Sequence, residues 1–402
     1  MSLSEAELLD DVRQRLFSPT RSAAPHAVGL ELELIPVFRG SNKRVPAIDA
    51  AGVSSSATLS RLGIREAWAE QLAGDDPSSW TLRDGSSISF EPGGQIEIST
   101  TPHPTASAVI EAAQRIVARL AEVMSDDGIE LLARGVDPYN AVEAVPLQLH
   151  RERYVGMTRY FESLGSSGVR MMRQTAALQI NLERGADSIS RWRLLNALAP
   201  VVVALFANSR GYAGESTGWA SYRAQLWRTL DPSRTGIIYD ELDPAAEYLR
   251  FALDAGAMRA RDGSGYRRFR DWMTSPEVDR DQWQFHLSTL FPEVRPKEFF
   301  ELRSADAIGA ESLAAPVVFV TGLVYDPHSA QAALDLLGMP NNELLQRAGR
   351  LGRADPAIRS LAITLTQLSL DGARRLGGDY ISPRHIEDAE RYFARAFAAD
   401  DI

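Results

Sequence analysis

The stretch Val28-Gly-Leu-Glu-Leu-Glu-Leu34 alternates apolar and polar residues along most of its length. Successive side chains of a strand point to opposite faces, so its three leucines share one face, and Glu31 and Glu33 share the other. Such alternation is typical of half-buried strands, usually in antiparallel sheets. The stretch therefore predicts a strand that is apolar on one face and carries two carboxylates, about 7 Å apart, on the other.

Three further stretches show the same alternation: Gln95-Ile-Glu-Ile-Ser99, Leu178-Gln-Ile-Asn-Leu182 and Phe299-Phe-Glu-Leu-Arg303. The sequence around them has helical character. The expected helices are Thr105–Ser125, Asp187–Ala207, Gly309–Val324, Ser329–Leu337, Pro356–Leu376 and Ser382–Ala399. We therefore predict the α+β class, with one domain built on an antiparallel sheet in residues 1–326. A helical region, residues 327–402, is expected to pack on that domain.

Composition excludes several classes of protein. The 402 residues are 45% hydrophobic and 24% charged, as in ordinary globular proteins, and their net charge of −10 argues against nucleic-acid binding. With no cysteine, the chain has no disulfide, zinc–thiolate site or thiol nucleophile. The acidic start Met1–Thr20 does not resemble a secretory leader, and the apolar run Leu194–Ala207 is too short to span a membrane. We expect a cytoplasmic protein without a membrane partner.

The polar strand faces are candidates for a metal site. Glu31 and Glu33 point into one volume, and Glu91, Glu97 and Glu301 join them if the strands are neighbours. Crowded carboxylates repel one another unless a cation lies between them, and Mg²⁺ prefers oxygen ligands. Amide oxygens would come from Gln179 and Asn181. The alternative is an ordinary solvated sheet face, although paired Glu, Gln and Asn are uncommon in strands.

A second candidate region is Ser221-Tyr-Arg-Ala-Gln-Leu-Trp-Arg228, followed by Asp231-Pro-Ser-Arg-Thr-Gly236. Arg223 and Trp227 are four residues apart, so they share one face of a helix. Arginine is well suited to forked recognition of a carboxylate or phosphate. The alternative is that these arginines form surface ion pairs. The common Gly-rich phosphate-binding loops are absent from the sequence.

These residues also form an ordered set of motifs that resembles a known family. The set comprises Glu91-Pro-Gly-Gly-Gln95 with Glu97-Ile-Ser99, Met171-Met172, Gln179-Ile-Asn181, Leu205-Phe-Ala-Asn-Ser209, Gly218-Trp219, Ser221–Trp227, Arg234-Thr-Gly236, His286–Arg295 and Glu301-Leu-Arg303. It covers roughly Val28 to Asp326 and is similar to the plant and bacterial type-2 glutamate–cysteine ligases. The resemblance implies a curved antiparallel sheet that forms a funnel, as in glutamine synthetase and the guanidino kinases. It also implies that ATP phosphorylates the γ-carboxylate of glutamate and that an amine then displaces phosphate.

The resemblance assigns roles to individual residues. Two or more Mg²⁺ ions are expected to bind the metal ligands, which are Glu31, Glu33, Glu91, Glu97, Gln179 and Glu301. Arg303 is expected to stabilise the transferring phosphoryl group, with Glu97 and Glu301 also catalytic. The residues expected to bind the substrates are Arg223, Trp227, Gln95, Asn181, Arg234 and Thr235, with Arg223 on the α-carboxylate of glutamate.

The identity of the acceptor amine is less directly indicated, because the matching motifs serve ATP, metal and glutamate. L-Cysteine is the expected acceptor, and a different amino acid or amine is the alternative. A catalytically inactive relative would be expected to lack a metal carboxylate or the phosphoryl arginine, and this chain has both. The sequence leaves open whether the protein is a monomer or a homodimer.

Overall fold

A large antiparallel sheet organises the computed structural model, which describes residues 3–20, 26–48, 52–66, 69–71, 79–239, 243–262 and 265–398. In these residues nine strands pair in the order β14-β15-β7-β1-β5-β4-β3-β2, and β6 pairs with the second half of β1. Their bounds are β1 (Val28–Phe38), β2 (Ala69–Gln71), β3 (Ser79–Leu82), β4 (Ser87–Phe90), β5 (Ile96–Ser99), β6 (Ile129–Leu132), β7 (Ala177–Leu182), β14 (Val294–Pro296) and β15 (Phe300–Asp306). The four strands predicted from alternation are thus neighbours in the order β15, β7, β1 and β5.

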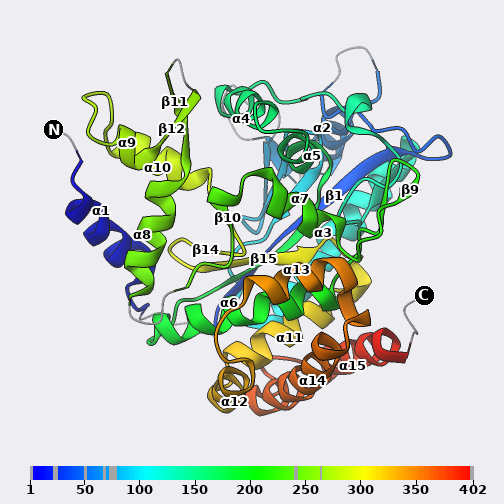
Figure 1. Cartoon of the computed structure of the whole chain (residues 1–402). Helices are drawn as coiled ribbons and strands as arrows, with labels where there is room; N and C mark the ends of the chain where they lie inside the picture. Colours follow the sequence, from blue (N-terminus) through cyan, green and yellow to red (C-terminus); the bar gives the residue numbers. More distant parts are fainter. Residues whose placement is uncertain are drawn as a thin grey trace.

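Helices flank this sheet on both sides (Figure 1). Their bounds are α1 (Glu5–Val12), α2 (Ser55–Glu66), α3 (Ala106–Asp126), α4 (Glu152–Glu162), α5 (Ser167–Gln174), α6 (Ser188–Leu205), α7 (Tyr222–Leu230), α8 (Pro244–Asp254), α9 (Phe269–Trp272), α10 (Arg280–Ser288), α11 (Ala314–Val324), α12 (Pro327–Leu337), α13 (Asn342–Leu351), α14 (Pro356–Leu376) and α15 (Pro383–Ala398). Short strand pairs are β8 (Gly211–Tyr212) with β9 (Glu215–Ser216), β10 (Thr235–Gly236) with β13 (Phe291–Pro292), and β11 (Gly256–Asp262) with β12 (Gly265–Arg268). The predicted α+β class with an antiparallel sheet is confirmed.

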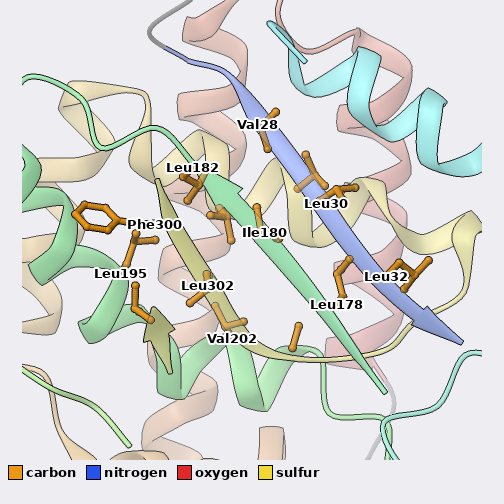
Figure 2. Packing of buried hydrophobic residues seen from close by; sticks show 14 of the residues in the cluster. Val28, Leu30, Leu32, Leu178, Ile180, Leu182, Leu195, Val202, Phe300 and Leu302 are labelled. Carbon is orange, nitrogen blue, oxygen red and sulfur yellow. The ribbon is translucent and has the colours of Figure 1, made fainter. Parts of the chain in front are cut away.

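The apolar face of the sheet packs on helices and forms the main core. Leu30, Leu32 and Leu34 are at most 2% exposed, as the alternation predicts. Figure 2 shows the apolar side chains of β1, β7 and β15 beside Leu195 and Val202 of α6. Burial of this face stabilises the fold by roughly 25 cal/mol per Å² of apolar surface removed from water. It also directs the opposite, polar face of the same strands away from the core.

The C-terminal helices belong to this core. α14 and α15 pack against α11, and their buried side chains join the cluster that contains Val28. The division of the chain into a catalytic domain, residues 1–326, and a helical region, residues 327–402, packed on it stays a prediction. Within the described residues, none of the helices combines the length and the apolar character needed to cross a bilayer.

Candidate active site

Strand register brings the predicted carboxylates together. Glu33 of β1 lies opposite Glu97 of β5, and Glu31 lies opposite Gln179 of β7. Directly opposed residues have Cβ atoms about 5 Å apart. A cavity of about 1000 Å³ opens over this polar face. Nine predicted site residues line it, namely Glu31, Glu33, Glu91, Gln95, Glu97, Gln179, Arg223, Trp227 and Arg303.

Three of these carboxyl groups are both buried and close to one another. Burial, followed by the charge of Glu97, raises the pKa of Glu33 to about 8. Burial and then Glu91 raise the pKa of Glu97 to about 8, and burial and then Glu33 raise that of Glu91 to about 7. Few hydrogen bonds offset this repulsion: Glu33 accepts from Ala177 N at 2.9 Å and from Gln179 Nε2 at 3.3 Å.

This donor set fits a hard divalent cation. In the part of the chain that the structure describes, no three acidic or histidine side chains already converge as a metal-binding group. Mg²⁺ typically takes one or two protein carboxylates and completes its shell with phosphate and water, so such convergence is not required. Burial and then mutual repulsion raise the pKa of Glu33, Glu91 and Glu97, and a cation bound between these groups would lower it again. The side chains therefore fit the predicted metal, whose binding stays a prediction.

Glu301 differs from the other predicted metal ligands because cations surround it. Its side chain is inaccessible to solvent and forms ion pairs with Arg295 Nε at 2.6 Å, with Lys297 Nζ at 2.5 Å and with Arg303 Nη1. Burial acts to raise the pKa of Glu301, but Arg295, Arg303 and Lys297 hold it well below its ordinary value. In this arrangement Glu301 orients Arg303, which the family resemblance predicts to act in phosphoryl transfer. Its predicted role as a metal ligand is not tested by these contacts.

Two buried guanidinium groups share one tryptophan. The Cζ atoms of Arg223 and Arg303 each lie 5.0 Å from the ring centroid of Trp227. Arg223 Nη2 donates to Arg303 O at 2.8 Å, and Arg223 Nη1 lies 3.9 Å from Oδ1 of Asp306. The Nε atoms of both arginines and Nε1 of Trp227 are buried without a hydrogen-bond partner among the residues that the structure describes. These donors can accept an anionic ligand, because buried donors are stabilised by a hydrogen bond.

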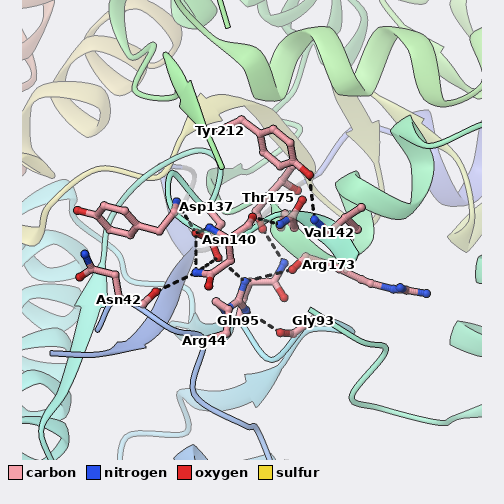
Figure 3. A network of polar contacts seen from close by, with 12 residues as sticks. Asn42, Arg44, Gly93, Gln95, Asp137, Asn140, Val142, Arg173, Thr175 and Tyr212 are labelled. Carbon is pink, nitrogen blue, oxygen red and sulfur yellow. Dashed lines mark hydrogen bonds and ion pairs between the residues drawn. The ribbon is translucent and has the colours of Figure 1, made fainter. Parts of the chain in front are cut away.

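The turn Glu91–Gln95 is held from behind by a polar network (Figure 3). Arg44 Nη2 donates to Gly93 O at 2.6 Å, and Arg44 Nη1 lies 3.3 Å from the buried Asp137. Gln95 Nε2 donates to Thr175 O at 2.8 Å, which ties the turn to the end of α5. Gln95 therefore lines the cavity with its side chain anchored to backbone, while Glu91 keeps its carboxyl group in the cavity.

Three predicted substrate-binding residues do not line the cavity. Arg234 is inaccessible to solvent and donates to Asp231 Oδ2 at 2.8 Å and to Thr289 O at 2.9 Å. Thr235 pairs with Phe291 in the short sheet of β10 and β13. Asn181 donates to Glu31 Oε1 at 3.0 Å and so lies one contact behind the cavity wall. In this conformation the side chain of Arg234 is bonded to other parts of the protein. The sequence analysis, which considered arginines as ligands for a carboxylate or phosphate, did not predict this.

Sequence reasoning missed part of the cavity wall. α4 contributes Arg153, Tyr154 and Met157, and α10 contributes Gln284. The π-helical turn Arg13–Phe17 supplies further lining residues before β1. No alternation marks these positions. The sequence near Arg153 has the pattern of a charged helix start. A π-helical turn is identified by backbone hydrogen bonding rather than by residue type.

The chain is similar to a described protein family and to several known proteins. The family profile described as "Glutamate-cysteine ligase family 2(GCS2)" matches residues 27–372. Glutamate–cysteine ligase EgtA of Mycolicibacterium smegmatis is 33% identical over 312 residues, covering 73% of this chain and 72% of that protein. The chloroplastic glutamate–cysteine ligase of Arabidopsis thaliana is 31% identical over 345 residues, covering 79% of this chain and 66% of that protein. The crystal structure of glutamate–cysteine ligase from Francisella tularensis with AMP superposes with a TM-score of 0.49 at 11% identity, covering 95% of this chain and 83% of that one.

Proposed function

Because this chain belongs to glutamate–cysteine ligase family 2, a family of ATP-dependent ligases, we propose that it joins the γ-carboxylate of L-glutamate to the amine of L-cysteine. Ligation of glutamate to an amine follows from the family. The choice of cysteine is the finer part of the proposal. A different amino acid or amine is the alternative acceptor, because the sequence motifs do not identify the acceptor side chain.

The reaction has two bond-making steps. A γ-carboxylate oxygen of glutamate attacks the terminal phosphorus of ATP, the bond from that phosphorus to ADP breaks, and γ-glutamyl phosphate forms. The amine nitrogen then attacks the acyl carbon, the bond from this carbon to the phosphate oxygen breaks, and phosphate leaves. The nitrogen loses a proton to solvent or phosphate as the amide forms. The products are ADP, phosphate and the γ-glutamyl amide.

The crowded carboxylate face beside buried arginines is the observation that carries this proposal. Glu31, Glu33, Glu91 and Glu97 would hold two or more Mg²⁺ ions, which would supply positive charge to offset the negative charge of the phosphoryl group during its transfer. Arg303 is oriented by Glu301 and would stabilise the transferred phosphoryl group.

Arg223 would bind the α-carboxylate of glutamate. Its guanidinium lies against Trp227 and donates to a backbone oxygen, so it is already oriented before substrate arrives. An oriented arginine loses little conformational freedom when it forms a forked contact. Trp227 contacts the guanidinium groups of both Arg223 and Arg303 and would shape the pocket by holding Arg223 in place.

The proposal is tested by measuring phosphate release with Mg²⁺-ATP and glutamate across a panel of amines. Mass spectrometry identifies the products. Rapid turnover with L-cysteine alone, giving a γ-glutamyl dipeptide, is the expected result. Faster turnover with another amine would replace only the acceptor. No turnover with any amine would contradict ligase activity, and a Tm unchanged by Mg²⁺-ATP plus glutamate would contradict binding of these ligands as well.

A further inference from the structure

Two cations of the cavity, Arg153 and Arg184, form no ion pair among the described residues, and Arg184 is bonded instead to the Thr20 side chain and to Arg15 O. Arg295, Lys297 and Arg303 form ion pairs with Glu301. Arg223 lies 3.9 Å from the carboxylate of Asp306. Arg153 also lines the cavity, but among the residues that the structure describes it forms no ion pair, and its hydrogen bond runs from Nη2 to Ser288 O at 2.9 Å.

The free donors of Arg153 lie in a partly buried setting. Its Nε is buried and has no hydrogen-bond partner within the described part of the chain. Burial lowers the pKa of Arg153, and the charges of Arg295 and Arg303 lower it further, whereas Glu91 opposes them. Taking a cation out of water without a counter-charge is unfavourable, so an anionic group of a ligand would stabilise this side chain. The charged groups of the cavity that act on Arg153 thus include Glu91 of the carboxylate face and the two arginines that pair with Glu301.

The surface next to Arg153 is apolar. Met157 lies one turn further along α4, on the same helix face, and is 4% exposed. Leu287 of α10 and Phe291 also line the cavity, and the bond from Arg153 to Ser288 O joins α4 to this segment. Phe291 contacts Trp227 edge-to-face at 5.6 Å, which links this surface to the side of the cavity that holds Arg223.

An arginine with free donors beside a methionine and aromatic surface fits the carboxylate of an amino acid whose side chain is uncharged. We propose that Arg153 binds the α-carboxylate of the acceptor and so makes the enzyme select an α-amino acid over an amine that lacks a carboxylate. This inference rests on the proposed ligase function and adds the residue that recognises the acceptor amino acid. Arg223 then serves glutamate and Arg153 the acceptor, so the two amino acids have separate arginines.

The test compares Arg153→Gln and Arg153→Lys with the full-length wild type in steady-state kinetics. L-Cysteine and cysteamine differ by the α-carboxylate, so their ratio of kcat/KM measures its recognition. We expect wild type to prefer cysteine by about 100-fold or more, because an unpaired buried polar group discriminates strongly. In Arg153→Gln the preference should fall at least tenfold through a higher KM for cysteine, and Arg153→Lys should restore part of it. Arg159→Gln, an exposed position of the same helix, should keep the wild-type ratio.

Hydroxylamine separates failure of this inference from failure of the ligase proposal. It traps γ-glutamyl phosphate as a hydroxamate and has no carboxylate, so Arg153→Gln should impair hydroxamate formation far less than turnover with cysteine. No hydroxamate from wild type would overturn the ligase proposal itself. Two outcomes would overturn the role of Arg153. In the first, hydroxamate forms but Arg153→Gln leaves the cysteine-to-cysteamine ratio of kcat/KM unchanged. In the second, Arg153→Gln raises only the KM of glutamate or ATP. If another amino acid is the acceptor, the same comparison is made with its decarboxylated counterpart.

Discussion

Replacing Arg44 with methionine tests how the turn Glu91–Gln95 is held at the cavity wall. Arg44 is 9% exposed, and its ion-pair partner Asp137 is completely buried. Its Nη2 donates to Gly93 O at 2.6 Å, and its Nη1 donates to Arg173 O at 3.2 Å. Methionine has a similar length but no charge and no donor, so it fills the space without replacing these interactions.

The magnitude follows from what the substitution leaves behind. Removing one partner of a buried ion pair destabilises a protein by about 3–5 kcal/mol, because the other charge is left uncompensated. Asp137 still accepts from the backbone N–H groups of Tyr139 at 2.9 Å and Asn140 at 3.0 Å, and from the Asn140 side chain. We therefore expect the lower end of this range, a loss of about 3 kcal/mol in the free energy of unfolding.

Urea unfolding followed by tryptophan fluorescence measures this loss. Arg39→Met is the matched control, because Arg39 is exposed and close to Arg44 in the chain, and it should change the free energy by less than about 0.5 kcal/mol. The double variant Arg44→Met with Asp137→Asn should be more stable than the sum of the single changes predicts, by about 1–3 kcal/mol.

The same variant has a consequence for the site. Arg44 supports the turn that carries Glu91, so Arg44→Met should also raise the KM for Mg²⁺-ATP. This is measured without urea, where the variant is still folded. A loss below about 1 kcal/mol, or one no larger than that of Arg39→Met, would refute the argument from burial. Additive single changes would show that Arg44 and Asp137 do not interact.

Three further predictions concern the cavity and its surroundings. Binding of Mg²⁺-ATP should release at least one proton at pH 7, because the raised pKa values of Glu33 and Glu97, both about 8, must fall when a cation binds. Calorimetry in two buffers of different ionisation enthalpy measures this release, and equal heats of binding in the two buffers would contradict it. Arg223→Ala should raise the KM for glutamate well above its effect on the KM for ATP, and an unchanged glutamate KM would move the α-carboxylate contact elsewhere. Burial lowers the pKa of His286 from 6.5 to about 3, so between these pH values the folded state binds fewer protons than the unfolded state. The free energy of unfolding should therefore fall as the pH drops below 6.5, by up to about 1.4 kcal/mol per pH unit. Urea unfolding of His286→Gln at several pH values should show a shallower slope than wild type.

Local sequence predicted the strands and most of the site because its signals are periodic. The alternation in Val28–Leu34 determines which side chains share a face, whatever the strand pairs with, and the structure confirms the buried leucines. The same reasoning placed Glu97 and Gln179 on polar faces, and both line the cavity. The predicted helix Thr105–Ser125 corresponds to α3, displaced by one residue, because its cap and apolar repeat are local.

Contacts between distant segments were decided by tertiary structure alone. Arg234 and Arg153 are both arginines near helical segments, yet one is enclosed by Asp231 and backbone oxygens and the other has free donors in the cavity. No local pattern distinguishes them, since burial depends on which segments pack around each guanidinium. Arg44 and Asp137 are 93 residues apart, and their pairing follows from packing around the turn Glu91–Gln95. The sequence by itself thus determined the strands, their polar face and the family, whereas three-dimensional packing decided which charged groups face the ligand and which support the wall behind it.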